Sequence, residues 1–227
     1  MKVRVIFSAI VLSLAANRGG AQTATPPDPA KPGAEAPSDR TAFQAALKVE
    51  DPKLKIEALE KFKKDFPQSA MVSSATMNIF STLVQKLPDQ TARIQQLADT
   101  SYRAADKKAK GSMAGQFADT LLTNNLLLHD AEHYAQKSLA AMDQAEYLKD
   151  QKASYEKRKA TVPSDAELIK RFKQSRATRV ALLGRIEFKL GKNAAAQKLL
   201  EESYRVSAAP PAHKPSLIHR VIHKGEK

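Results

Sequence analysis

The chain of 227 residues contains no cysteine and no tryptophan, and only 6% of its residues are aromatic. The absence of cysteine excludes disulfide bonds, thiolate metal sites, a thiol nucleophile and the lipid-carrying cysteine of an exported lipoprotein. Glycine is also scarce, at 8 residues. A core must therefore be built mainly from Leu, Ala, Ile and Val, and this composition favours helices over a sheet.

Basic residues outnumber acidic ones, 37 against 24, and the formal net charge is +13. Chains of this kind often bind nucleic acid or anionic membrane surfaces. Which of these partners is available depends on the cellular compartment, so the N-terminus decides how the charge is interpreted.

The first 21 residues have the layout of a secretory signal peptide. Lys2 and Arg4 precede an apolar stretch that ends at Ala16, and small residues follow up to Ala21. That stretch is much shorter than the roughly 20 apolar residues that span a bilayer. We expect cleavage after Ala21, a periplasmic or secreted protein, and no stable membrane span in the mature chain. A short N-terminal anchor helix is the alternative. Export argues against nucleic acid as the partner.

The remaining chain divides into three segments. Residues 22–40 are rich in Pro and Ala without an apolar period, which predicts a disordered spacer. Residues 41–206 show helical periodicity and form the predicted folded domain. Residues 207–227 form a basic C-terminal tail.

The folded domain is predicted to contain eight helices joined by short connections, so that neighbours form antiparallel hairpins. Asp89 is a predicted N-cap, Ser164 or Asp165 begins a later helix with Glu167 in its first turn, and Gly191 ends that helix. The expected ranges are 40–50, 53–66, 69–87, 90–107, 112–128, 130–158, 165–190 and 193–206.

A local pattern recurs in the second helix of each pair, where an alanine is followed four residues later by a large apolar residue. The pairs are Ala58 with Phe62, Ala98 with Tyr102, Ala135 with Leu139, and Ala196 with Leu200. Residues 177–210 carry the fullest version, with Leu183, Gly184, Gly191, Ala196, Leu200, Ser203 and Pro210. In these residues the chain resembles the tetratricopeptide repeat. Short side chains at Gly184, Ala196 and Ser203 would let two helices approach closely.

This resemblance implies an all-α fold in which antiparallel hairpins stack as an α-solenoid. It also implies a non-catalytic scaffold or adaptor that binds a protein or peptide, of acidic character in view of the basic chain, without a cofactor. The peptide would lie in a groove lined by the first helices, with Asn124 where some members of the family grip a carboxylate. The implied groove residues are Thr120, Asn124, Leu127, Thr178, Ala181, Arg185 and Phe188. An irregular α-bundle is the alternative architecture.

The layout of roughly residues 1–206 is also similar to the N-terminal helical part of some exported bacterial thioredoxin-like proteins. The chain has no Cys-x-x-Cys motif, so redox activity does not follow from this resemblance. An alternative function is therefore a helper, or a truncated segment, of such an envelope protein.

Motifs that carry chemistry are sparse. There is no Gly-x-Ser-x-Gly elbow, phosphate loop or dinucleotide fingerprint. The stretch HDAEH, with His129, Glu132 and His133, is the basis of a less favoured alternative, a zinc-dependent hydrolase. We expect a helix junction near Asp130 to separate the two histidines, and therefore predict no metal site and no enzyme.

Residues 148–185 concentrate positive charge. The stretch is interpreted either as a hydrated helix surface or as a docking surface for an acidic protein or envelope polymer.

Overall fold

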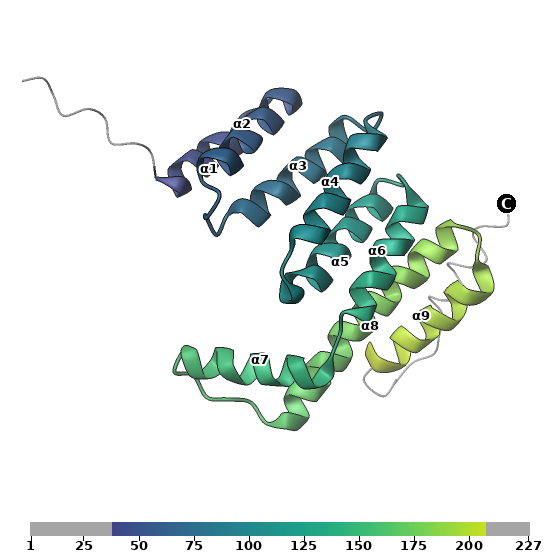
Figure 1. The fold of residues 1–227 in the computed structure, drawn as a ribbon. Helices are drawn as coiled ribbons and strands as arrows, with labels where there is room; N and C mark the ends of the chain where they lie inside the picture. The colour runs from purple at the N-terminus through teal and green to yellow at the C-terminus, as the bar shows by residue number, and fades with distance from the viewer. Residues whose placement is uncertain (1–37, 208–227) are drawn as a thin grey trace, which may run out of the picture. The chain divides into compact units, whose positions relative to one another are not determined.

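The computed structural model describes residues 38–207, and every regular element in that range is an α-helix. In chain order these are α1 (Asp39–Leu47), α2 (Pro52–Asp65), α3 (Val72–Lys86), α4 (Thr91–Ala104), α5 (Lys107–Thr123), α6 (Leu128–Ala140), α7 (Gln144–Lys157), α8 (Asp165–Lys189) and α9 (Asn193–Ser207) (Figure 1). The predicted all-α fold class is confirmed.

Several sequence-derived segments lie wholly or largely outside these residues, namely the signal peptide 1–21, the spacer 22–40 and the tail 207–227. Asp39 and Arg40, assigned to the spacer from the sequence, belong to α1. Within residues 38–207, no helix combines the length and the apolar character that crossing a membrane requires.

Local capping explains where α8 begins and ends. At its start, the Ser164 hydroxyl accepts a hydrogen bond from the backbone N–H of Glu167, whose carboxylate accepts one from the Ser164 N–H. This reciprocal arrangement satisfies backbone donors that the helix itself leaves unpaired. After the helix, Gly191 adopts a left-handed conformation with φ +76°. Both features were predicted.

The predicted N-cap at Asp89 is wrong. Helix α4 begins at Thr91, and its N-cap residue Gln90 makes no side-chain capping bond. The reason is a turn after α3, in which the backbone N–H of Gln90 donates to the carbonyl of Leu87 at 3.0 Å. The turn places Asp89 one residue too early to cap the helix.

Several other predicted helix boundaries differ from the structure by a few residues, and two of the differences have a clear physical cause. Gly111, expected to precede a helix, lies inside α5, where an added Cβ atom would come within 2.9 Å of the Cβ of Ala141. The expected helix 130–158 is two helices, α6 and α7, because the Asp143 carboxylate caps α7 by accepting a bond from the Glu146 N–H at 2.8 Å. Gly111 therefore permits close packing rather than ending a helix.

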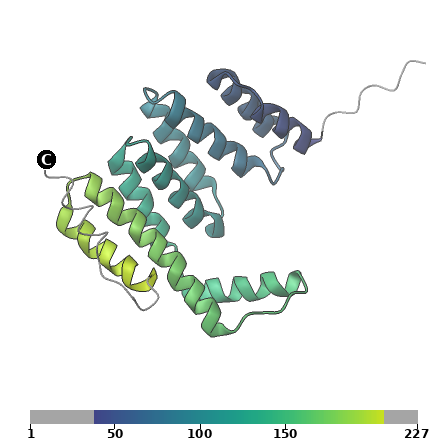
Figure 2. The same cartoon turned by 180° about the vertical axis from the view of Figure 1, so that it is seen from behind.

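Helices that are neighbours in sequence pack as pairs, most extensively α5 with α6 and α8 with α9. Contacts between successive pairs join α2 to α3, α4 to α5, α6 to α8, α3 to α5 and α5 to α8. Helix α7 is an addition to this order: it packs against α8 and has no buried residue. The view from behind shows α8 running past α6 and α9 to meet α7 (Figure 2).

Aromatic side chains join three of the helices at the centre of the core. The rings of Phe80 on α3 and Phe117 on α5 lie 4.5 Å apart, and Tyr134 on α6 lies 5.4 Å from Phe117. The Tyr134 hydroxyl donates to the Asp99 carboxylate on α4 at 2.7 Å. Burial, followed by this hydrogen bond, raises the pKa of Tyr134, so its hydroxyl remains a donor.

Short side chains bring α8 and α9 together. An added Cβ atom at Gly184 would lie 3.0 Å from Leu200 Cγ, and both Ala196 and Ser203 on α9 are buried. The predicted role of these small residues in close helix packing is confirmed. The close packing of α8 and α9 holds Leu200 against α8, next to the cavity described below.

Candidate functional site

The groove residues implied by the sequence fall on two regions of the chain. Thr120 lies on α5, Asn124 ends that helix as its C-cap and Leu127 precedes α6, whereas Thr178, Ala181, Arg185 and Phe188 lie on α8. The structure brings Arg185 and Phe188 to one cavity with the end of α5, and it places Thr120 in a separate groove between α3 and α5.

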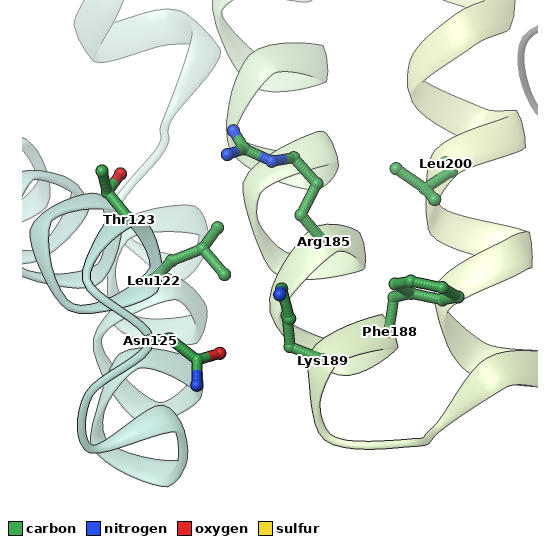
Figure 3. A pocket seen from close by; sticks show the side chains of 7 residues that line it. All are labelled: Leu122, Thr123, Asn125, Arg185, Phe188, Lys189 and Leu200. Carbon is green, nitrogen blue, oxygen red and sulfur yellow. The ribbon is translucent and has the colours of Figure 1, made fainter. Parts of the chain in front are cut away.

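The cavity between α5 and α8 has a volume of about 440 Å³. Its walls come from the C-terminal end of α5, the last two turns of α8 and one residue of α9. The lining residues are Leu122, Thr123, Asn125, Arg185, Phe188, Lys189 and Leu200 (Figure 3). This volume lies within the range, roughly 300–1,000 Å³, that is usual for ligand sites.

Two cations dominate the electrostatics of this cavity. Arg185 and Lys189 are four residues apart on α8, so both project from the same side of the helix toward the end of α5 (Figure 3). Both are exposed, and neither forms an ion pair or a side-chain hydrogen bond with another residue in 38–207. No acidic residue lines the cavity. Like charges at this spacing repel each other, and a bound anion would relieve that repulsion.

The rest of the cavity is largely apolar. Leu122 is buried at its α5 wall, and Phe188 projects from α8 toward Leu200 (Figure 3). The position of Leu200 depends on Gly184, because a side chain there would meet the leucine. The cavity thus offers apolar contact next to two positive charges.

The end of α5 has an unusual backbone. Asn125 and Leu127 both have left-handed conformations, with φ of 50° and 48°. Asn tolerates this region, whereas a leucine there is uncommon. The Asn124 amide donates to the Thr120 carbonyl at 2.8 Å, within its own helix. Asn124, Leu127, Thr178 and Ala181 are not among the residues that line the α5–α8 cavity.

A groove between α3 and α5 consists of two adjoining depressions, of about 460 Å³ and 210 Å³, that share Met77, Asn78 and Gln116. Serine side chains and methionine supply much of its remaining wall. Asp119 is the only charged residue that lines it. Polar uncharged side chains together with methionine suit an extended peptide, because they can hydrogen-bond and adapt in shape.

The groove and the cavity open along one face of α5. Gln116 and Thr120 line the groove, and Thr123 lines the cavity. Residues three and four apart lie on the same side of a helix, so these three form a continuous stripe. A ligand lying along this stripe would pass from the nearly uncharged groove into the positively charged cavity.

The expected helix junction at Asp130 is wrong, since α6 begins at Leu128 and includes both His129 and His133. The junction lies earlier because the chain turns at Asn125. Glu132, the remaining member of the motif, binds Lys192 Nζ at 2.5 Å and 2.7 Å through its two carboxylate oxygens. Within the described part of the chain, no group of three or more His, Asp or Glu side chains is placed to hold a metal ion.

Sequence reasoning identified Arg185 and Phe188 but missed most of the cavity. Lys189 could have been found, because it follows Arg185 at helical spacing. Leu122, Thr123 and Asn125 carry no such signal, since their proximity to α8 depends on how α5 packs against it.

Comparison of the chain with protein-family models, with curated proteins and with solved structures finds no match.

Proposed function

We propose that this chain is an exported, non-catalytic scaffold of tetratricopeptide-like hairpins stacked as a solenoid, which binds an acidic peptide segment of a partner protein. The segment lies across α3, α5 and α8, the first helices of successive hairpins. The pairing of helices and the contacts between pairs support this arrangement. The signal-peptide layout of residues 1–21 supports export.

The observation that carries the proposal is the pairing of unneutralised charge with apolar surface in the α5–α8 cavity. Arg185 and Lys189 supply two cations with no acidic residue among the lining side chains. Phe188 and Leu200 supply the apolar contact beside them. A peptide with an acidic residue next to a leucine or phenylalanine complements both, and the charges also accelerate its association.

The proposal predicts that removing the two cations weakens peptide binding. The purified chain beginning at Gln22 is titrated with a fluorescein-labelled peptide that alternates acidic and large apolar residues. Arg185→Ala combined with Lys189→Ala should raise the Kd at least about ten-fold, because a hydrogen bond to a charged group contributes about 1.5–3 kcal/mol. Fluorescence anisotropy measures the change.

The matched control is Lys170→Ala combined with Lys173→Ala, which removes the same charge from exposed positions on the same helix. A peptide whose acids are replaced by their amides tests the charge of the ligand. Equal weakening in the two double variants would show that net charge alone attracts the peptide and would contradict the proposed site. So would tight binding of the amide peptide.

A further inference from the structure

A second cavity lies at the other end of α5, where α5, α6, α7 and α8 meet. Its volume is about 320 Å³. It shares no lining residue with the α5–α8 cavity described above. Its lining includes one half-buried arginine, three lysines, three carboxylates, three aromatic side chains and two serines, and these groups suggest a ligand of a different kind.

Arg179 on α8 lines this cavity and lacks a counter-charge. Its Nη1 donates to the backbone carbonyl of Ser138 at 2.5 Å, and within residues 38–207 it forms no ion pair with a carboxylate. Several further N–H donors of the guanidinium remain available. Burial lowers the pKa of Arg179, which reflects the cost of removing its charge from water without compensation.

The carboxylates that line the cavity are already engaged elsewhere. Glu146 pairs with Lys107 at 3.1 Å and Asp150 pairs with Lys108 at 2.7 Å. Asp143 caps α7 through the backbone N–H of Glu146. No acid of the cavity is therefore committed to Arg179, and an anion from outside the chain would supply the missing charge.

Aromatic side chains form the apolar wall. Tyr147 on α7 and Phe172 on α8 lie 5.4 Å apart between ring centroids, and Tyr102 faces the same space from α4. Ser112 and Ser175 add hydroxyl groups to the lining. Aromatic rings beside a half-buried guanidinium suit a flat organic anion, because ring stacking and charge pairing act on different parts of one molecule.

We propose that this cavity binds a small aromatic carboxylate, whose carboxylate pairs with Arg179 while its ring packs against Tyr147 and Phe172. The site adjoins the groove between α3 and α5, with which it shares Ser112, and shares no lining residue with the α5–α8 cavity that contains Arg185. Because Tyr147 belongs to α7, which has no buried residue, a bound ligand ties α7 more firmly to α8.

The experiment uses phenylacetate as the probe with the purified chain beginning at Gln22. Calorimetry should show saturable binding, and hydrogen exchange of the α7 amides should slow in its presence. Phenylacetamide, hexanoate and inorganic phosphate are the comparison ligands. Phenylacetate should bind more tightly than all three, because each lacks either the charge or the aromatic ring.

Arg179→Gln is the test variant, since its amide retains a donor for the Ser138 carbonyl. It should weaken phenylacetate binding about ten-fold or more. Arg185→Gln, which removes a cation from the peptide cavity, should leave phenylacetate binding unchanged. This control keeps the test independent of the proposed function.

Four results would overturn the proposal. They are the absence of saturable phenylacetate binding, equal affinity for phenylacetamide or phosphate, an unchanged affinity in Arg179→Gln, and an acidic peptide that binds through Arg179 while phenylacetate does not.

Discussion

Single residues of α8 determine a close contact between helices and bury a carboxylate oxygen without a hydrogen-bond partner within residues 38–207. Gly184 allows Leu200 to reach α8, which shapes one wall of the proposed peptide cavity. Three residues further along α8, Glu187 is buried and its Oε2 has no hydrogen-bond partner in the described structure. Burial raises the pKa of Glu187, the nearby Glu132 carboxylate adds to this rise, and Lys192 opposes it.

The raised pKa of Glu187 predicts a pH-dependent stability. A carboxyl group whose pKa is higher in the folded than in the unfolded chain favours folding at acidic pH, and this contribution is lost as the pH rises through the folded pKa. Glu187→Gln should therefore raise the free energy of unfolding at neutral pH by on the order of 1 kcal/mol, and change it little in acid. Urea unfolding at both pH values measures this.

Glu57→Gln, at an exposed position on α2, is the control for loss of a negative charge. A Glu187→Gln variant that is destabilised at neutral pH would show that the carboxylate makes a favourable interaction instead.

At the scale of elements, α7 is held mainly by exposed contacts, whereas the start of α8 combines a local cap with a buried side chain, Leu168. Helix α7 has no buried residue, and its ion pairs with α5 are exposed. Exposed ion pairs contribute little to stability. The first turn of α8 is held by the capping box of Ser164 and Glu167 together with burial of Leu168.

Ser164→Ala should lower the stability of the first turn of α8 by about 1 kcal/mol, because it removes the acceptor for the Glu167 N–H. Hydrogen exchange should accelerate at the start of α8 and remain unchanged near Gly184. Ser154→Ala, at an exposed position within α7, is the matched control. Equal exchange in the two variants would mean that packing against α7 holds this turn.

At the scale of the whole folded unit, one aromatic residue joins successive helix pairs. Phe117 on α5 contacts Phe80 on α3 and Tyr134 on α6, and it is fully buried. The groove between α3 and α5 and the cavity at the end of α5 both depend on the position of this helix. Stability and the proposed ligand binding are therefore linked through the same core.

Phe117→Ala should reduce the free energy of unfolding by about 3–5 kcal/mol through the cavity it leaves. Because the ring contacts both α3 and α6, amides of the two helices should lose protection together. Tyr204→Ala, at an exposed position on α9, should change stability by no more than about 0.5 kcal/mol. Loss of protection confined to α5 would contradict the role of Phe117 in joining the helix pairs.

The sequence by itself determined the helical fold class and many of the helix ends. These features are local: apolar spacing acts within a few turns, and Ser164, Glu167 and Gly191 act on adjacent backbone groups. The close approach of α8 and α9 could also be predicted from their small residues, because such an approach requires small residues at regular spacing.

Only the tertiary structure decided the position of Gly111 inside α5 and the residues that share each cavity. Gly111 resembles a helix break until Ala141, which follows α6, is seen to pack against it. Likewise, Arg185 lines one cavity with Leu122, and Arg179 donates to the Ser138 carbonyl, only because α8 packs against α5 and α6. Such contacts join residues far apart in the chain, and no local periodicity encodes which helix faces which.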